Sequence, residues 1–300
     1  MSNYLISIVG PTAIGKTALS IQLAQHFGTE IISCDSRQFF KEMAIGTAVP
    51  SQEEQNAANH HFIQHISIFD EYNVGQFEKD AIAKLDELFQ RHNIVVMVGG
   101  SGLYVDAVLK GLDDFPKVDP QIREDLNQQL TTKGITSLQQ QLQELDPVYY
   151  KKVAKENPHR LIRALEICIG SGKPYSSFLK AEMTQRNFTS IKVGLTADRE
   201  IIYDRINRRV DIMMNEGLLK EAKALYKHKS LNALQTVGYR ELFSYFDGDF
   251  TLDFAISEIK KNTRRFAKRQ GTWFRRDTNT SWFDYQEEVS NIIDQINILM

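Results

Sequence analysis

The chain has 300 residues, of which 42% are hydrophobic and 25% are charged, and its net charge is −2 at pH 7. These values are typical of a globular protein with a full core, built as one large domain or as a domain with an insertion. The two cysteines, Cys34 and Cys168, are too few for a disulfide framework or a cysteine metal site. No apolar segment approaches membrane-spanning length and no signal segment opens the chain, so we expect a cytoplasmic protein without a membrane partner.

A phosphate-binding loop follows the first predicted strand. An apolar run over 4–9 leads into the pattern G-x-x-x-x-G-K-[ST], and a helical pattern over 16–27 leads out of it, which is the context that this motif requires. In such a loop, backbone N–H groups surround an oligophosphate, the lysine adds positive charge, and the hydroxyl ligates magnesium. We therefore predict a diphosphate or triphosphate site formed by Gly10, Pro11, Thr12, Ala13, Ile14, Gly15, Lys16 and Thr17.

Two further predicted strands place polar residues beside this loop. A short apolar run over 30–33 leads to Asp35, and another over 94–98 leads through a second glycine-rich turn to Ser101. Because the carboxyl ends of parallel strands face the ligand crevice, Asp35 should lie near the phosphate loop, either as a catalytic group or as a cap or turn residue. The second turn either connects a strand tightly to a helix or lets the backbone approach a substrate.

The segment between these strands is polar and then helical. Residues 52–59 are rich in Gln, Glu and Asn, and His60, His61 and His65 follow. Because no carboxylate or cysteine stands at ligand spacing, a loop and strand edge is favoured over a metal site. Apolar residues at helical spacing predict a helix over 74–89.

A helical region interrupts this α/β pattern. From residue 113 onward, prolines separate amphipathic helices predicted over 121–130, 138–145 and 159–169, and Asp119 is placed to cap the first of them. We interpret residues 115–187 as an all-helical insertion. The remaining segments, 1–114 and 188–300, then form one discontinuous core domain.

The core pattern resumes with an apolar strand over 191–195 and a helix capped by Asp198. Arg205 and Arg209, four residues apart, share one face of this helix. They either clamp a phosphoryl oxygen or form a solvated face, and composition alone favours the solvated face.

After this helix and the segments that follow it, the chain turns basic. Residues 260–276 contain eight lysines and arginines and no acidic residue, together with Phe266, Trp273 and Phe274. On a helix these cations form two adjoining rows. A run of one charge on a nearly neutral protein favours an extended polyanion such as RNA over a plain solvated face. A strand over 282–285 and a terminal helix over 289–299 complete the chain.

Seven segments occur in one order along the chain: GPTAIGKT, IISCDSRQFFKEMAIGTA, VGGSGLY, NPHRLIRALE, DRINRRVDIM, TVGYRE and TRRFAKRQGTWFRR. The series resembles the tRNA dimethylallyltransferase family, also called the tRNA isopentenyltransferases, from the phosphate loop nearly to the C-terminus. Many folds share the phosphate loop, whereas the ordered set is specific. The resemblance implies an α/β fold with a P-loop NTPase-like parallel sheet, helices on both of its faces, and an inserted all-helical domain.

The resemblance also implies the chemistry. The family transfers a dimethylallyl group from dimethylallyl diphosphate to the exocyclic amine of the adenosine 3′ of the anticodon in tRNA. Lys16, the loop amides, Mg²⁺ at Thr17, and Arg205 or Arg209 would stabilise the departing diphosphate. Asp35 matches the family's proposed general base, and Ser101 corresponds to a hydroxyl residue near the reacting amine.

The predicted partner is the anticodon stem-loop of tRNA, bound by a monomer. The target adenosine must leave its stack, so backbone and base contacts are needed to hold it out. The predicted contacts are Asp35, Ser36, Arg37, Gln38, Ser101, Arg123, His159, Arg160, Arg163, Gly238, Tyr239, Arg240, Lys268, Arg269, Gln270, Trp273 and Arg275.

Departures from the family pattern are mild. Ile14 stands where a small or hydroxyl residue is usual, Ser101 replaces Thr, and Arg265-Phe266 replaces a common Gln-Tyr pair. The zinc-finger extension of eukaryotic relatives is absent, which indicates the bacterial type. Two other functions share the loop: a small-molecule or nucleotide kinase that uses ATP, and a non-catalytic RNA-binding module driven by nucleotide hydrolysis. Neither explains the full series of segments.

Overall fold

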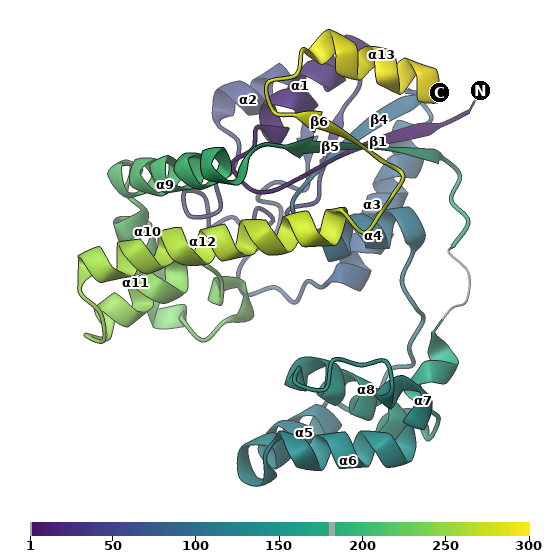
Figure 1. Cartoon of the computed structure of the whole chain (residues 1–300), viewed down its shortest axis with the longest axis vertical. Coiled ribbons are helices and arrows are strands. Elements are labelled where there is room, and N and C mark those ends of the chain that lie inside the picture. The colour runs from purple at the N-terminus through teal and green to yellow at the C-terminus, as the bar shows by residue number, and fades with distance from the viewer. Residues whose placement is uncertain (1, 180–183) are drawn as a thin grey trace. The chain divides into compact units, whose positions relative to one another are not determined.

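The protein divides into two compact units. The computed structural model describes residues 2–179 and 184–300, and Figure 1 traces the chain. One unit combines Met1–Lys110 with Gln185–Met300, and the other is the continuous segment Gly111–Thr184. This second unit begins and ends a few residues before the predicted insertion.

A six-stranded sheet forms the centre of the larger unit. Its strands run in the order β3-β2-β4-β1-β5-β6, and every neighbouring pair is parallel. The strands are β1 Tyr4–Val9, β2 Ile31–Ser33, β3 His60–His61, β4 Ile94–Val98, β5 Thr189–Thr196 and β6 Thr280–Asp284. The predicted fold class is thereby confirmed. Two of the three histidines form the edge strand β3, as expected.

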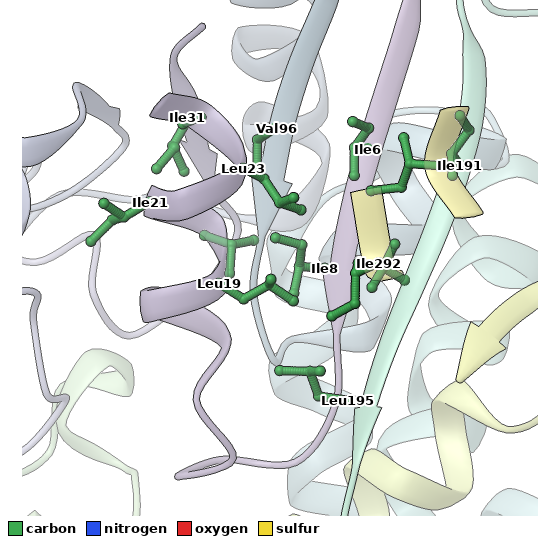
Figure 2. Packing of buried hydrophobic residues seen from close by; sticks show 14 of the residues in the cluster. Ile6, Ile8, Leu19, Ile21, Leu23, Ile31, Val96, Ile191, Leu195 and Ile292 are labelled. Atoms are coloured by element: carbon green, nitrogen blue, oxygen red, sulfur yellow. The ribbon is translucent and has the colours of Figure 1, made fainter. Parts of the chain in front are cut away.

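Ile6 and Ile8 of β1 point to one face of the sheet because side chains alternate along a strand. Helices α1, Lys16–Phe27, and α13, Val289–Leu299, cover this face. Figure 2 shows the resulting cluster, in which Ile6 and Ile8 lie among Leu19, Leu23, Ile191 and Ile292. Burying an aliphatic side chain of this kind stabilises the fold by about 1.5–3 kcal/mol.

Leu5 and Val9 point to the opposite face. There they pack against α3, Val74–Leu88, against α4, Gly102–Lys110, and against the end of α12, Leu252–Phe274. The basic helix therefore contributes its last residue to the core of the sheet. Helices cover both faces, as predicted.

The C-terminal helices build a second core within the larger unit. Leu218, Tyr239, Leu242 and Ile259 are buried there together with Met43 from the segment after β2. This core was not predicted, because the apolar face of a helix carries no signal for the partner against which it packs. The elements are α9 Arg199–Glu216, α10 Leu218–Leu225, η2 Tyr226–His228, η3 Asn232–Leu234, α11 Tyr239–Phe246 and α12.

Capping explains where several helices begin and end. Gly28 ends α1 with φ 60°, and Asn73 and Asp119 accept backbone N–H groups at the starts of α3 and of α5, Pro120–Lys133. Asp198 occupies the N-cap position of α9, but its side chain makes no capping bond, so the predicted cap is wrong in that respect. The polar segment after Ser51 forms an unpredicted short helix, α2 Gln52–Ala57, with a capping box to Glu54.

The smaller unit is entirely helical where it is described. Leu126, Leu138, Leu142, Leu161 and Leu165 form its core, and they come from three helices. The elements are α5 Pro120–Lys133, α6 Ile135–Leu145, α7 Pro147–Tyr150, α8 Pro158–Ser171 and the 3₁₀ turn η1 Tyr175–Phe178. Across the described part of the chain, no helix combines the length and apolar character that a membrane span requires.

Candidate active site

The phosphate loop joins the carboxyl end of β1 to the first turn of α1. Gly10 and Gly15 have φ of 144° and 112°, and Ala13 has φ of 66°. A Cβ atom on Gly10 would lie 2.6 Å from the carbonyl oxygen of Leu195 in β5, so only glycine fits. The left-handed conformation costs a non-glycine residue such as Ala13 about 1–2 kcal/mol. The loop is thus held in one tight conformation, and its residues from Thr12 to Thr17 line a cavity.

Lys16 curls back over this loop. Its ammonium donates hydrogen bonds to the carbonyl oxygens of Gly10, at 3.1 Å, and Pro11, at 2.8 Å. Burial of the ammonium lowers the pKa of Lys16 to about 8, although the nearby Asp35 carboxylate acts in the opposite direction. An incoming phosphate oxygen would replace the loop carbonyls and stabilise the charged form.

Arg205 and Arg209 reach the phosphate loop from α9. Arg205 Nε donates to the carbonyl oxygen of Ala13 at 2.7 Å, and Arg209 Nη1 donates to Thr12 Oγ1 at 3.4 Å. Burial lowers the pKa of Arg209, while Asp35 raises it. The solvated face that composition favoured is therefore wrong, and both arginines line the cavity that the loop surrounds.

Two cavities meet beside this loop. The first, which we call the phosphate cavity, has a volume of about 530 Å³ and is lined by the phosphate loop and both arginines. The second, the base cavity, has a volume of about 540 Å³ and is lined by Ser101, Tyr104, Phe266 and Trp273 among others. The residues common to both linings are Thr12, Asp35, Thr47, Gly100 and Arg209. We call these the shared wall.

Asp35 belongs to the shared wall. It follows β2 and the buried Cys34, and its Oδ1 accepts the backbone N–H of Arg37 at 3.1 Å. The carboxylate therefore forms a local turn and faces both cavities, so the two predicted roles are compatible. A carboxylate at this position could accept a proton from a group bound in either cavity.

The residues after Asp35 fix the rim of the cavities. Ser36 and Ser101 are joined by the Ser36 N–H, which donates to Ser101 Oγ at 3.1 Å, and their hydroxyls lie 3.2 Å apart. Arg37 Nη1 donates to the carbonyl oxygens of residues 232 and 233 at 3.1 and 2.9 Å. Gln38 donates to those of residues 47 and 48 at 3.2 and 2.8 Å. These predicted RNA contacts thus also hold the protein's own loops.

Helix α12 carries part of the base cavity, and it lies beside α9 (Figure 1). Phe266 and Arg269 line the cavity on the exposed side, and Trp273 Nε1 donates to Asp106 Oδ2 at 2.8 Å. Lys268, Arg269 and Arg275 are exposed, as an RNA contact requires.

Tyr239 does not lie where an RNA contact requires, whereas Gln270 is buried but borders a cavity. Tyr239 has no exposed surface, and its hydroxyl donates to Glu221 at 2.6 Å, so the prediction is wrong for this side chain. Gln270 is only 5% exposed and its amide bonds the protein's own backbone, but the residue lines the base cavity, so its contact with tRNA stays a prediction. Gly238 is buried as well, whereas Arg240 remains exposed.

In the smaller unit, one carboxylate organises the predicted cations. Glu166 pairs with Arg123 at 2.5 Å and with Arg163 at 3.4 Å. His159 and Arg160, in the first turn of α8, are exposed.

Sequence reasoning missed two residues that shape the site. Thr47 belongs to the shared wall, and Glu221 fixes the segment before it by accepting the N–H groups of Ala44, Ile45 and Gly46 at 3.0, 2.9 and 2.9 Å. Thr47 lies inside one of the segments that resemble the family, so the resemblance could have indicated it as a site residue. Glu221 lies in an ordinary amphipathic helix and gave none.

The fold and site define a class of protein: a phosphate-loop α/β protein with two adjoining cavities. Comparisons with known proteins narrow this class. The family model described as IPP transferase matches residues 38–277. A tRNA dimethylallyltransferase from Flavobacterium johnsoniae is 67% identical over 299 residues, covering 98% of this chain and 97% of the relative. One from Bacteroides fragilis is 49% identical, covering 95% and 94%.

Solved structures agree with these relatives. A tRNA isopentenylpyrophosphate transferase from Bacillus halodurans matches with a TM-score of 0.72 and 38% identity, covering 99% of this chain and 95% of that chain. A eukaryotic dimethylallyltransferase acting on tRNA matches with a TM-score of 0.82 and 27% identity, covering 95% and 75%. The chain belongs to the IPP transferase family, and it is an enzyme that prenylates tRNA. This identity confirms the resemblance and rules against the kinase alternative.

Proposed function

We propose that the phosphate cavity binds dimethylallyl diphosphate and the base cavity binds the extruded adenosine 3′ of the anticodon. The observation that carries this proposal is the position of Asp35 in the shared wall, with Lys16 and Arg209 beside it. The two substrates would then meet at a carboxylate.

The reaction follows from this arrangement. The exocyclic nitrogen of adenosine is a weak nucleophile because its lone pair is delocalised into the purine. As that nitrogen bonds to the first carbon of the prenyl group, the carbon–oxygen bond breaks and the diphosphate leaves with the electron pair. Asp35 accepts the proton from nitrogen, while Lys16, Arg205, Arg209 and the loop amides stabilise the charge that develops on the diphosphate.

Magnesium would be bound at this site mainly by the diphosphate of the prenyl donor. Among the described residues, no group of three or more His, Cys, Asp or Glu side chains could hold a metal ion. Mg²⁺ is usually bound by one or two protein ligands together with substrate phosphates, so Thr17 and the diphosphate oxygens would suffice. When bound, the ion would neutralise charge on the leaving group.

The tRNA partner is proposed to contact α12 and the smaller unit. Exposed cations on α12 and on α8 offer sites for phosphate groups, and Phe266 and Trp273 offer ring faces for an unstacked base. Because its substrate is tRNA, we expect this enzyme to act in the cytoplasm, as a monomer.

The test is incubation of the purified protein with unmodified tRNA, Mg²⁺ and labelled dimethylallyl diphosphate. We expect the label in RNA at one adenosine. Thermal unfolding provides a second test, because pyrophosphate should raise the melting temperature more than ATP does. Absence of label in RNA, together with phosphate transfer from ATP, would overturn the proposal.

A further inference from the structure

Gln270 is buried in α12, on the helix that carries the exposed cations Lys268 and Arg269. A buried amide must satisfy its donor and its acceptor within the protein. Gln270 does so with two backbone groups that are far away in sequence, one in each glycine-rich turn.

Its oxygen, Oε1, accepts the N–H of Thr12 in the phosphate loop at 2.9 Å, and its nitrogen, Nε2, donates to the carbonyl oxygen of Gly100 at 2.9 Å. The contact with the second turn is close, since a Cβ atom on Gly100 would lie 2.3 Å from Gln270 Nε2. A carboxamide supplies an acceptor and a donor on two separate atoms at one side-chain end, whereas an ionised Glu lacks the donor.

Thr12 and Gly100 are both members of the shared wall. The amide therefore bridges the wall at the place where the donor carbon and the acceptor nitrogen must meet. Gln270 itself lines the base cavity but not the phosphate cavity. Its effect on the reaction therefore acts through the two turns that it joins.

We infer that Gln270 is a positioning residue that sets the spacing of the two glycine turns and thereby aligns the two substrates. This inference rests on the proposed function. Misalignment of reacting atoms by about 1 Å can cost about 10²-fold in rate while the substrates still bind. Loss of the bridge should accordingly lower kcat and leave both KM values nearly unchanged.

The test compares Gln270→Met, which keeps the size and loses both bonds, with Gln270→Glu, which keeps the acceptor alone. Gln270→Met should lower kcat about 10- to 100-fold, with KM for dimethylallyl diphosphate and for tRNA within about threefold. Gln270→Glu should lower kcat and also raise the KM for the donor, because it adds negative charge beside the diphosphate. Thr272→Ala is the matched control, since the hydroxyl of Thr272 bonds only to its own helix at Lys268. It should behave like the unchanged enzyme.

A second measurement needs no turnover. Hydrogen exchange at the Thr12 amide should accelerate in Gln270→Met, and the melting temperature should fall little. Unchanged kcat, or parallel losses of kcat, both affinities and melting temperature, would overturn the inference. If the unchanged protein transfers no prenyl group, the proposed function fails. In that case, hydrogen exchange at the Thr12 amide, compared between the unchanged protein and Gln270→Met, still tests whether Gln270 joins the two turns.

Discussion

The cations of the phosphate cavity and the cations of α12 differ in what holds them. Lys16, Arg205 and Arg209 are fixed by hydrogen bonds to the phosphate loop, and burial lowers the pKa of Lys16 and of Arg209. Lys268 and Arg269 are exposed to water. Charge that must stabilise a transition state benefits from being fixed in advance, whereas charge that binds an RNA backbone acts by releasing counterions. The first group should therefore control kcat and the second the salt dependence of tRNA binding.

A third group on α12 shows that position on a basic helix does not decide function. Lys260 pairs with Asp211 at 2.6 Å, Lys261 pairs with Glu258, and Arg264 donates to Asn207 at 2.7 Å. These partners lie on α9 or one turn earlier on α12. In the first half of the basic segment 260–276, these side chains therefore bind other residues of the protein, and they are less available to a partner.

The largest expected effect is that of Asp35→Asn. The amide keeps an oxygen for the Arg37 N–H and loses the proton acceptor. A positioned base contributes about 10²–10⁴ to the rate, so kcat should fall by about that factor while tRNA affinity stays near the original value. Single-turnover rates and tRNA titrations measure the two quantities. An equal loss in both would show that Asp35 is structural and would remove the contrast between cavity and surface.

The second effect is a pH dependence that originates in Lys16. Its pKa in the folded, ligand-free protein is about 8, below its ordinary value. As pH rises through about 8, the ammonium is lost, so pyrophosphate affinity should fall by up to about tenfold per pH unit. The unfolded chain binds more protons between pH 8 and the ordinary pKa of 10.5, so the free energy of unfolding should rise with pH in that window.

Lys16→Met is the control for this titration. The variant should lower kcat by about 10²–10³ and abolish both pH dependences, because the titrating group is gone. Calorimetric titration of pyrophosphate and denaturant unfolding at a series of pH values test this. A pH profile that survives in the variant would assign the titration to another group.

A smaller effect is expected on α12. Replacing Lys268 and Arg269 by Gln should weaken tRNA binding and reduce the slope of log K against log salt by about one for each phosphate group that the variant no longer neutralises. At saturating tRNA, kcat should fall far less than in Asp35→Asn, although Arg269 lines the base cavity. The paired residues Lys260 and Lys261 are the matched control, and their replacement by Gln should leave the slope unaltered. Equal slopes in the two double variants would place the RNA elsewhere.

Much of this fold could be predicted because its signals are local. Strand runs, helical periodicity and the phosphate loop each depend on neighbouring residues, and the structure confirms β1, β4, β5 and α3 within a residue or two of the predicted bounds. The core formed by α10, α11 and α12 depends on which helices pack against one another. Sequence periodicity carries no such information.

The candidate site divides in the same way. The phosphate loop was predictable from its motif. The sequence does not indicate which face of α9 packs against the loop, and the structure shows that it is the face with Arg205 and Arg209. Gln270 could have been recognised as internal, since Ala267, Gln270 and Phe274 lie on one buried stripe of α12.

The smallest expected effect lies in the smaller unit, where single cations differ in their partners. Arg123 is already paired with Glu166, but Arg160 is exposed, and its guanidinium contacts no carboxylate in the described parts of the chain. If both face tRNA, Arg160→Gln should reduce the salt slope by about one, and Arg123→Gln should reduce it by less, because a pre-existing ion pair must be broken before Arg123 binds a phosphate. Filter-binding titrations at several salt concentrations measure both slopes. A larger effect of Arg123→Gln would mean that Glu166 holds this arginine in place for RNA instead of competing with RNA for it. The difference between cations fixed by protein contacts and exposed cations would then not apply to the smaller unit.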